Sequence, residues 1–379
     1  MSAKGPSGDL VETRTATQPV DTRAALGGIS VVVCNYNGEQ HLGLCLDSIL
    51  AQTLAVEEIL IVDNASTDAS LALAGERCPR AQVLVMKENN GPCPARNAGL
   101  RAANHPWVLL VDNDAVLEPD VLEKLALAAQ SRPDACLVQP RSVFAAEPGR
   151  VHYDGGGLHY VGLFSLRNFY TPLAEARGAG TQSVNGAVSV VLLVERKLVL
   201  HAGGFDERFF ILFEDLDLSL RLRLAGYELL SVADAVVLHR SGTPGISFRD
   251  GPLYPRRRAF YHSRNRWLTL IKNYRWRTLA VCMPGILAYE LVWLAFTLRS
   301  GGFLAHLKGK WAFLRLLPDA LQKRAAVQKA RRLPDRALLI GGPLTVAPQL
   351  LHSALARAVV GILDGWLQLW WRIARRLCG

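Results

Sequence analysis

The chain has 379 residues, of which 50% are hydrophobic, so it is long enough to bury a sizeable core. Its net charge of +10 is unevenly distributed: residues 1–250 contain 21 Lys and Arg against 29 Asp and Glu, whereas residues 251–379 contain 22 against 4. Seven cysteines without a CxxC pair argue against a disulfide framework or a zinc ribbon and favour a reducing, cytoplasmic compartment.

Three units are predicted along the chain. Residues 1–27 contain no apolar run and no basic start followed by a hydrophobic segment, so we predict a disordered tail rather than an ordinary secretory signal. Residues 28–275 form the main unit. Residues 276–379 are expected to form a helical, basic and amphipathic C-terminal region: the excess of Lys and Arg lies after residue 250, and seven of the eight tryptophans follow residue 260.

The main unit alternates strand-like runs with stretches long enough for a helix. The runs are "ISVVVC" (Ile29–Cys34), "EILIVD" (Glu58–Asp63), "QVLVM" (Gln82–Met86) and "WVLLV" (Trp107–Val111). Between the first two, Leu42, Cys45, Leu46, Ile49 and Leu50 form one helical stripe, and Pro119 is predicted as a first helical residue. The alternation predicts an α/β fold with a mostly parallel sheet flanked by helices.

Polar residues follow three of these strands directly, and parallel strands end at one edge of a sheet. Ligands bind beyond that edge in open α/β sheets. The residues are Cys34, Asn35, Tyr36 and Asn37 after the first strand, Asp63, Asn64 and Ser66 after the second, and Asp112, Asn113 and Asp114 after the fourth.

Asp112 and Asp114 stand one residue apart after a buried strand. A single Asp or Asn in such a place can simply cap the next helix, and that interpretation remains open for Asn64 and Ser66. One side chain is enough to cap a helix, so a pair of carboxylates indicates a different role. They suit a hard divalent cation, Mg²⁺ or Mn²⁺, which would in turn hold a diphosphate.

The stretch "GGFDERFFILFEDLDLSLRLRLAGY" predicts a glycine turn, an aromatic segment and a helix from about Glu214 to Ala225. Glu214 and Asp215 then lie on its first turn, where the helix dipole favours carboxylates. Asp217 is assigned to an ion pair with Arg221, four residues later.

Five ordered blocks carry a family resemblance. "VVVCNYNG", "EEILIVDNASTD", "ENNGPCPARNAGL", "LLVDNDAVLEPDVL" and the segment from "VNGAVSV" to "RLAGY" resemble the inverting glycosyltransferases of family 2, which have the GT-A fold. The closest likeness is to the bacterial rhamnosyltransferase-like branch. The resemblance covers residues 28–275, and it implies a GT-A catalytic domain that transfers a sugar from a nucleoside diphosphate, such as dTDP-rhamnose or a UDP-sugar.

The resemblance also implies roles for individual residues. On the donor side, Asp63 would pair with the nucleotide base, Cys34 and Tyr36 would line the same pocket, and Arg96 would hold the nucleotide end. Asp112 would contact the ribose or the metal, beside Asn113, and Asp114 would bind the metal.

On the acceptor side, Asp215 would be the catalytic base, with Glu214 beside it, and Asn185 and Gly186 would stand at the mouth of the site. His239 ends a further strand-like run, so its imidazole is a candidate third metal ligand. The alternative for His239 is an ordinary hydrogen-bonded surface histidine.

The C-terminal region predicts contact with a membrane. "TLAVCMPGILAYELVWLAFTL" (Thr278–Leu298) is long enough to cross a bilayer, but Pro284, Gly285 and Glu290 favour an interfacial or re-entrant segment. Near the end, Leu363, Trp366, Leu367, Trp370 and Ile373 are predicted to form one apolar stripe, with arginines crowding the terminus. A helical cap packed on the catalytic domain, or a dimer interface, is the alternative.

We therefore expect an enzyme at the inner face of the cell membrane, acting on a glycan or a polyprenyl-linked acceptor in the biosynthesis of surface polysaccharide or lipopolysaccharide. A processive synthase is less favoured, because "HSRNRW" lacks the glutamine of a QxxRW block. A sugar nucleotidyltransferase is also less favoured, since no glycine-rich GxGTR-like loop follows the first strand. The apolar bulk of the basic C-terminal region favours lipid over nucleic acid as its partner.

Overall fold

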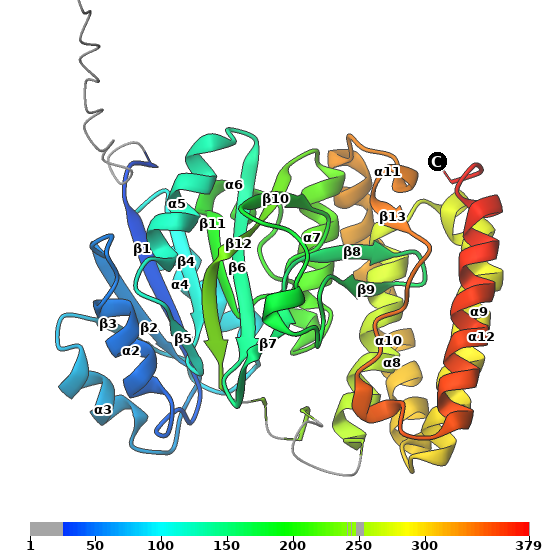
Figure 1. Cartoon of the computed structure of the whole chain (residues 1–379), viewed down its shortest axis with the longest axis horizontal. Helices are drawn as coiled ribbons and strands as arrows, with labels where there is room; N and C mark the ends of the chain where they lie inside the picture. Colours follow the sequence, from blue (N-terminus) through cyan, green and yellow to red (C-terminus); the bar gives the residue numbers. More distant parts are fainter. Residues whose placement is uncertain (1–25, 241, 244, 248–253, 379) are drawn as a thin grey trace, which may run out of the picture.

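The computed structural model describes residues 26–240, 242–243, 245–247 and 254–378, so nearly all of the predicted N-terminal tail lies outside the described residues. A mixed sheet of ten strands forms the centre of this part of the chain, in the order β10-β12-β6-β11-β4-β1-β2-β3, with β5 beside β12 and β7 beside β6 (Figure 1). Its strands are β1 (Ile29–Asn35), β2 (Glu58–Asp63), β3 (Gln82–Val85), β4 (Trp107–Asp112), β5 (Ala115–Leu117), β6 (Ala135–Phe144), β7 (Glu147–Tyr153), β10 (Thr181–Val184), β11 (Val191–Glu195) and β12 (Glu228–His239).

The predicted parallel core is confirmed in β3-β2-β1-β4, while β11 joins it antiparallel to β4. β1 and β4 are buried except at Cys34 and Asp112, and most of their residues are aliphatic, because helices cover both of their faces. The register pairs Cys34 with Asp112 and Asn35 with Asp63, so β1, β2 and β4 end level with one another.

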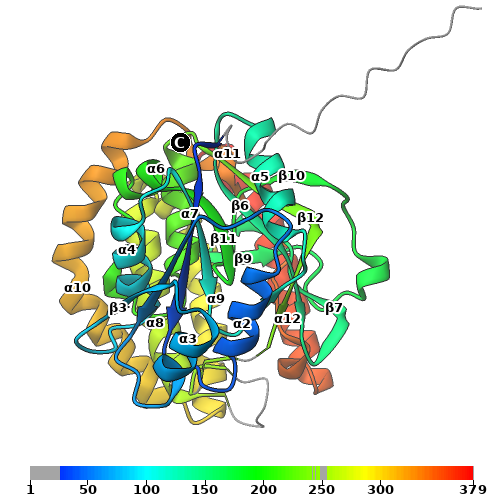
Figure 2. The same cartoon turned by 90° about the vertical axis from the view of Figure 1, so that its left-hand side faces the viewer.

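Helices cover the sheet on two sides (Figure 2). Side chains of α2 (Leu42–Leu50), α3 (Ser70–Arg77) and α5 (Val121–Ser131) share one core cluster with Val31 and Val33, whereas α4 (Pro92–Ala102), α6 (Arg196–His201) and α7 (Glu214–Leu224) share another with Val32. The prediction of a helix starting at Pro119 was two residues early. β5 intervenes after Asp114, and α5 begins only at Val121.

The C-terminal region consists of long helices that are joined to the main unit by a second, three-stranded sheet. That sheet places β13 (Leu339–Ile340) beside β8 (Gly156–His159), which pairs with β9 (Leu163–Leu166). The helices are α8 (Arg256–Asn273), α9 (Trp276–Arg299), α10 (Phe303–Ala330), α11 (Asp335–Leu338) and α12 (Ala354–Ala374), with the short 3-10 turn η3 (Pro348–Leu350) before α12. Two further 3-10 turns, η1 (Leu173–Glu175) and η2 (Glu207–Phe209), belong to the main unit. α9 and α12 run side by side at the right of Figure 1.

Tyr160 fastens α9 and α12 to the three-stranded sheet. Its ring is fully buried and stacks on Trp371 with ring centroids 5.1 Å apart, and its hydroxyl donates to the carbonyl of Leu367 at 3.2 Å. Gly285 of α9 permits this close approach, because a Cβ there would collide with the Tyr160 hydroxyl.

The residues of the stripe that was predicted on α12 for membrane contact divide into a buried and an exposed group. Leu363 and Leu367 are buried, and Trp371 completes the packed face, but Trp366 and Ile373 are exposed by 38% and 54%. α12 is therefore apolar on two sides, one packed against the protein and one facing outward. Among the described residues, α9 is a helix long and apolar enough to cross a membrane by length and composition alone, and most of it is not buried inside the protein.

Candidate active site

The loops after β1 and β2 are held together by Asp63. Its carboxylate is fully buried and accepts hydrogen bonds from Asn35 Nδ2 at 2.8 Å, from Ser66 Oγ at 2.6 Å and from the Ser66 amide at 2.9 Å. Cys34 is partly buried, and burial raises the pKa of its thiol to about 12, so it remains neutral. Tyr36, in contrast, is 47% exposed at the edge of the sheet.

The two aspartates after β4 adopt different environments. Asn113, between them, donates to Asn35 Oδ1 at 2.8 Å, which ties this turn to the exit of β1. β5 then pairs with the end of β12, and that pairing brings His239 Nε2 within 3.2 Å of Asp114 Oδ2. His239 Nδ1 in turn lies 3.0 Å from Nδ1 of His152, on β7, a neighbour that no sequence pattern indicated.

Arg96 connects this edge to the acid pair on α7. It lies on α4, is 3% exposed, and its Nη2 donates to Asp112 Oδ1 at 2.7 Å and to the Ser189 carbonyl at 2.8 Å. Its Nη1 lies 3.5 Å from Glu214 Oε1. Asp112 and Glu214, which are far apart in the sequence, therefore share one buried cation.

An unusual loop presents the acid pair at the start of α7. Phe210, Leu212 and Phe213 all have positive φ, a conformation that is unfavourable for bulky residues, and Glu214 follows immediately as the first residue of the helix. Asn265 of α8 stabilises this loop. It is fully buried, and its Nδ2 lies within 3.0 Å of the carbonyls of Phe209, Ile211 and Leu212. The sequence identified the acids but not this support, because the contact joins residues more than 50 positions apart.

Burial dominates the protonation of the acid pair. The pKa of Glu214 is raised, first by burial and then by the charge of Asp215, and its Oε2 has no hydrogen-bond partner among the described residues. The pKa of Asp215 is also raised by burial, although the Leu216 amide, Arg96 and the Ser189 backbone oppose that rise. Such a pair holds a proton more readily than ordinary carboxylates do, so it can accept one from an approaching hydroxyl.

Asn185 and Gly186, the two residues predicted at the mouth of the acceptor side, contact residues other than the acid pair. Asn185 accepts from Arg223 at 3.1 Å and donates to the Leu338 carbonyl at 3.2 Å, near the far end of α7. Arg223 follows Asp215 by eight residues, about 12 Å along the helix. Gly186 lies against the ring of Phe164, which lines the same cavity as Asp215, so Gly186 adjoins the site through that ring.

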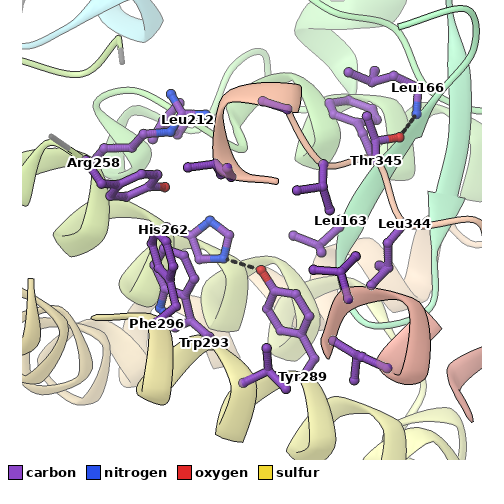
Figure 3. A pocket seen from close by; sticks show the side chains of 18 of the residues that line it. Leu163, Leu166, Leu212, Arg258, His262, Tyr289, Trp293, Phe296, Leu344 and Thr345 are labelled. Atoms are coloured by element: carbon purple, nitrogen blue, oxygen red, sulfur yellow. Dashed lines mark hydrogen bonds between the residues drawn. The ribbon is translucent and has the colours of Figure 1, made fainter. Parts of the chain in front are cut away.

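A cavity of about 780 Å³ opens from the acid pair toward the C-terminal helices. Figure 3 shows Leu212 and Arg258 on one side of it and Leu163 and Leu344 on the other, with the bond of 3.0 Å between His262 Nε2 and the Tyr289 hydroxyl on its wall. Both Glu214 and Asp215 line the cavity. The sequence did not reveal this space, because its walls come from α8, α9, α12 and β9.

The residues at the sheet edge suit a hard divalent cation in part. Asp112 and Asp114 supply carboxylate oxygens, and burial raises the pKa of Asp112, with the charge of Asp114 acting in the same direction. A cation would relieve that repulsion. Within the described ranges, no group of three histidine, cysteine or carboxylate side chains is arranged to hold a metal alone. Mg²⁺ commonly binds through one or two carboxylates together with substrate phosphates, so the donor set fits an ion bound with its substrate.

Comparisons with known proteins agree with this geometry. The family model described as "Glycosyl transferase family 2" matches residues 30–185. The "N-acetylglucosaminyl-diphospho-decaprenol L-rhamnosyltransferase" of Mycobacterium tuberculosis is 31% identical over 231 residues, which span 56% of this chain and 75% of the relative. The "Succinoglycan biosynthesis protein ExoO" of Rhizobium meliloti is 36% identical over 98 residues, which span 26% of this chain and 28% of that protein.

Among solved structures, the chain is similar to S. aureus TarS 1-349. The match covers 91% of each chain, with 18% identity and a TM-score of 0.48.

Proposed function

The chain belongs to glycosyltransferase family 2, and from that premise we propose that it transfers a sugar from a nucleoside diphosphate sugar to a hydroxyl of a lipid-linked or glycan acceptor, with inversion. The observation that carries the proposal is the bridge formed by Arg96, which joins Asp112 at the sheet edge to Glu214 of the acid pair on α7. Donor and acceptor groups can then meet at one point, as a single displacement requires.

The aspartates and Arg96 have separate tasks in this mechanism. Asp112, Asp114 and His239 would hold Mg²⁺ or Mn²⁺, which when bound stabilises the negative charge that develops on the leaving diphosphate. Arg96 holds Asp112 in position, since its guanidinium donates to that carboxylate, and its charge opposes the rise in the pKa of Asp112 that burial causes. Asp63 fixes the loops that would surround the nucleotide, with Cys34 and Tyr36 beside it.

Asp215 is proposed as the base. It is partly exposed to the cavity, whereas Glu214 is buried against Arg96, so Asp215 is the better placed carboxylate to take the proton of the acceptor hydroxyl. The bond from the acceptor oxygen to the anomeric carbon forms as the bond to the diphosphate breaks. No covalent sugar intermediate is needed.

The relatives guide the choice of substrates. The mycobacterial protein is named for rhamnosyl transfer to a diphospho-decaprenol, and the rhizobial protein for succinoglycan biosynthesis. We therefore propose a role in bacterial surface polysaccharide assembly, with dTDP-rhamnose tested first and UDP-sugars next.

Peripheral attachment to the inner face of the membrane would fit the C-terminal helices. Large apolar side chains are exposed on them, among them Leu291 (67%), Leu304 (70%), Trp311 (59%) and Ile362 (75%), in a region with 22 Lys and Arg against 4 Asp and Glu. Replacement of Leu291, Leu304, Trp311 and Ile362 by Ser should shift the protein from membrane to soluble fractions, and unchanged partitioning would contradict the attachment.

The proposed donor chemistry is tested by thermal unfolding with a panel of nucleoside diphosphate sugars. One donor should raise the melting temperature in Mg²⁺ or Mn²⁺ and should lose that effect when EDTA is added. The proposal is overturned when no donor stabilises the protein and none is hydrolysed, with or without metal.

A further inference from the structure

The cavity beside the acid pair has two helical walls with matching apolar stripes. On α9 the lining residues Leu291 and Ala295 are four apart, and on α12 Leu355, Val359 and Leu363 follow at the same spacing. Residues four apart lie on one side of a helix, so two continuous strips of hydrocarbon face one space. A volume of about 780 Å³ lies within the range of roughly 300–1,000 Å³ that is usual for ligand pockets.

One end of the cavity adjoins the proposed base. Phe213, which precedes Glu214, packs edge-on against His262 with ring centroids 5.2 Å apart, and both residues line the space with Asp215. A molecule that extends along the two strips can therefore present a hydroxyl to Asp215.

The same end carries positive charge. Tyr254 packs edge-on against Phe296 at 5.0 Å, which places the start of α8 beside the end of α9. Arg258, in the first turn of α8, and Arg299, the last residue of α9, both line the cavity there. His262 is one helical turn from Arg258, and burial keeps the pKa of its imidazole well below the ordinary value, so the two guanidiniums supply the charge. Two guanidiniums suit a phosphate or diphosphate.

The two strips are also open to the outside. Leu291 is 67% exposed, Leu355 is 65% exposed and Val359 is 38% exposed, although all three line the cavity. α9 and α12 expose further apolar side chains outside the cavity, among them Leu298 and Ile362, so a hydrocarbon chain can enter from a lipid surface.

From these four features we propose that the cavity binds the lipid portion of the acceptor: the hydrocarbon chain lies between α9 and α12, and the phosphate next to it lies between Arg258 and Arg299. The inference deepens the proposed function and rests on it, because it assumes an acceptor that is linked to a lipid. It gives the C-terminal helices a role in acceptor recognition that is separate from membrane attachment.

The test compares three probes by calorimetric titration of the full-length protein: farnesyl diphosphate, isopentenyl diphosphate and farnesol. EDTA is present throughout, so that metal-dependent binding at the sheet edge does not contribute. Each buried methylene strengthens binding about fourfold, so farnesyl diphosphate should bind at least about tenfold more tightly than isopentenyl diphosphate. Arg299→Gln should weaken farnesyl diphosphate and leave farnesol unchanged.

Two variants fill the space from opposite walls. Val359→Trp and Ala295→Trp change exposed residues that line the cavity, and each should abolish the preference for the longer chain. Ile362→Trp is the matched control, since Ile362 is 75% exposed on the same helix as Val359 and does not line the cavity.

Each outcome decides a different point. Equal binding of the two diphosphates by the wild type, or a preference that survives both cavity variants, overturns the inference and leaves the proposed transfer intact. Loss of the preference in Ile362→Trp also counts against this site. Absence of sugar transfer from every nucleoside diphosphate sugar overturns the proposed function, whatever the titrations show.

Discussion

The edge of the central sheet and the C-terminal helices handle charge and hydrophobicity in opposite ways. At the sheet edge, Arg96 and Glu214 are almost fully buried and face each other together with Asp112. On the C-terminal helices, leucines and tryptophans such as Leu304 and Trp311 are more than half exposed. The first region holds charged side chains in fixed positions, and the second exposes apolar surface.

The largest expected effect concerns the buried guanidinium of Arg96 at the sheet edge. Arg96→Ala removes the shared partner of Asp112 and Glu214, so the free energy of unfolding should fall by about 3–5 kcal/mol. Chemical denaturation measures the change. Arg101→Ala, an exposed position on the same helix, should shift it by less than about 0.5 kcal/mol, and similar losses in both variants would contradict the role of Arg96.

Asn265 of α8 tests whether the C-terminal helices also hold the acid pair in position. Asn265→Leu removes the donor that holds three loop carbonyls, so the acid pair should move and kcat should fall about 100-fold, while the KM for the donor stays unchanged. Steady-state kinetics below the unfolding temperature separate the two constants. A parallel loss of donor binding would indicate general disruption instead.

The raised pKa of Glu214 predicts that the free energy of unfolding depends on pH. Its pKa is raised in the folded state, so the stability that it contributes is present below the unfolded value, about 4.3, and is lost as pH rises through the folded value. Glu214→Gln lacks this loss. Relative to wild type, the variant should gain up to about 1.4 kcal/mol per pH unit within that window. Denaturation midpoints across pH measure it, and a constant difference would show that burial does not perturb Glu214.

The smallest expected effect concerns the attachment of α12. Tyr160→Phe removes one buried hydrogen bond to Leu367 and should cost about 1 kcal/mol. Amide hydrogen exchange should accelerate in α12 more than in β1. Tyr227→Phe, just before β12, is the control, and equal acceleration across both elements would mean that Tyr160 supports the whole protein rather than this helix.

Local patterns predicted the sheet edge well for a physical reason. Buried parallel strands leave continuous aliphatic runs in the sequence, and their polar exits must lie level once the strands pair, which is the observed register of Cys34 with Asp112. The start of α7 at Glu214 was also predictable, because the acids and the glycine at 226 mark its two ends.

What could not be predicted depends on contacts between distant segments. Asn265 beneath the acid loop, His152 behind His239 and the cavity walls on α9 and α12 leave no periodic signal. The stripe predicted on α12 for membrane contact differs from the structure at Leu363 and Leu367, which pack inward, for a related reason: apolar residues occur all around this helix, so the sequence does not say which side packs inward.

The central claim is that the aspartates of the sheet edge and Asp215 act on one donor and one acceptor. It is tested most directly by measuring metal-dependent donor binding and sugar transfer in Asp114→Asn and Asp215→Asn side by side. Asp114→Asn should lose metal-dependent donor binding. Asp215→Asn should keep donor binding and lose transfer by about 10²–10⁴-fold. Transfer at the wild-type rate by Asp215→Asn would contradict the account.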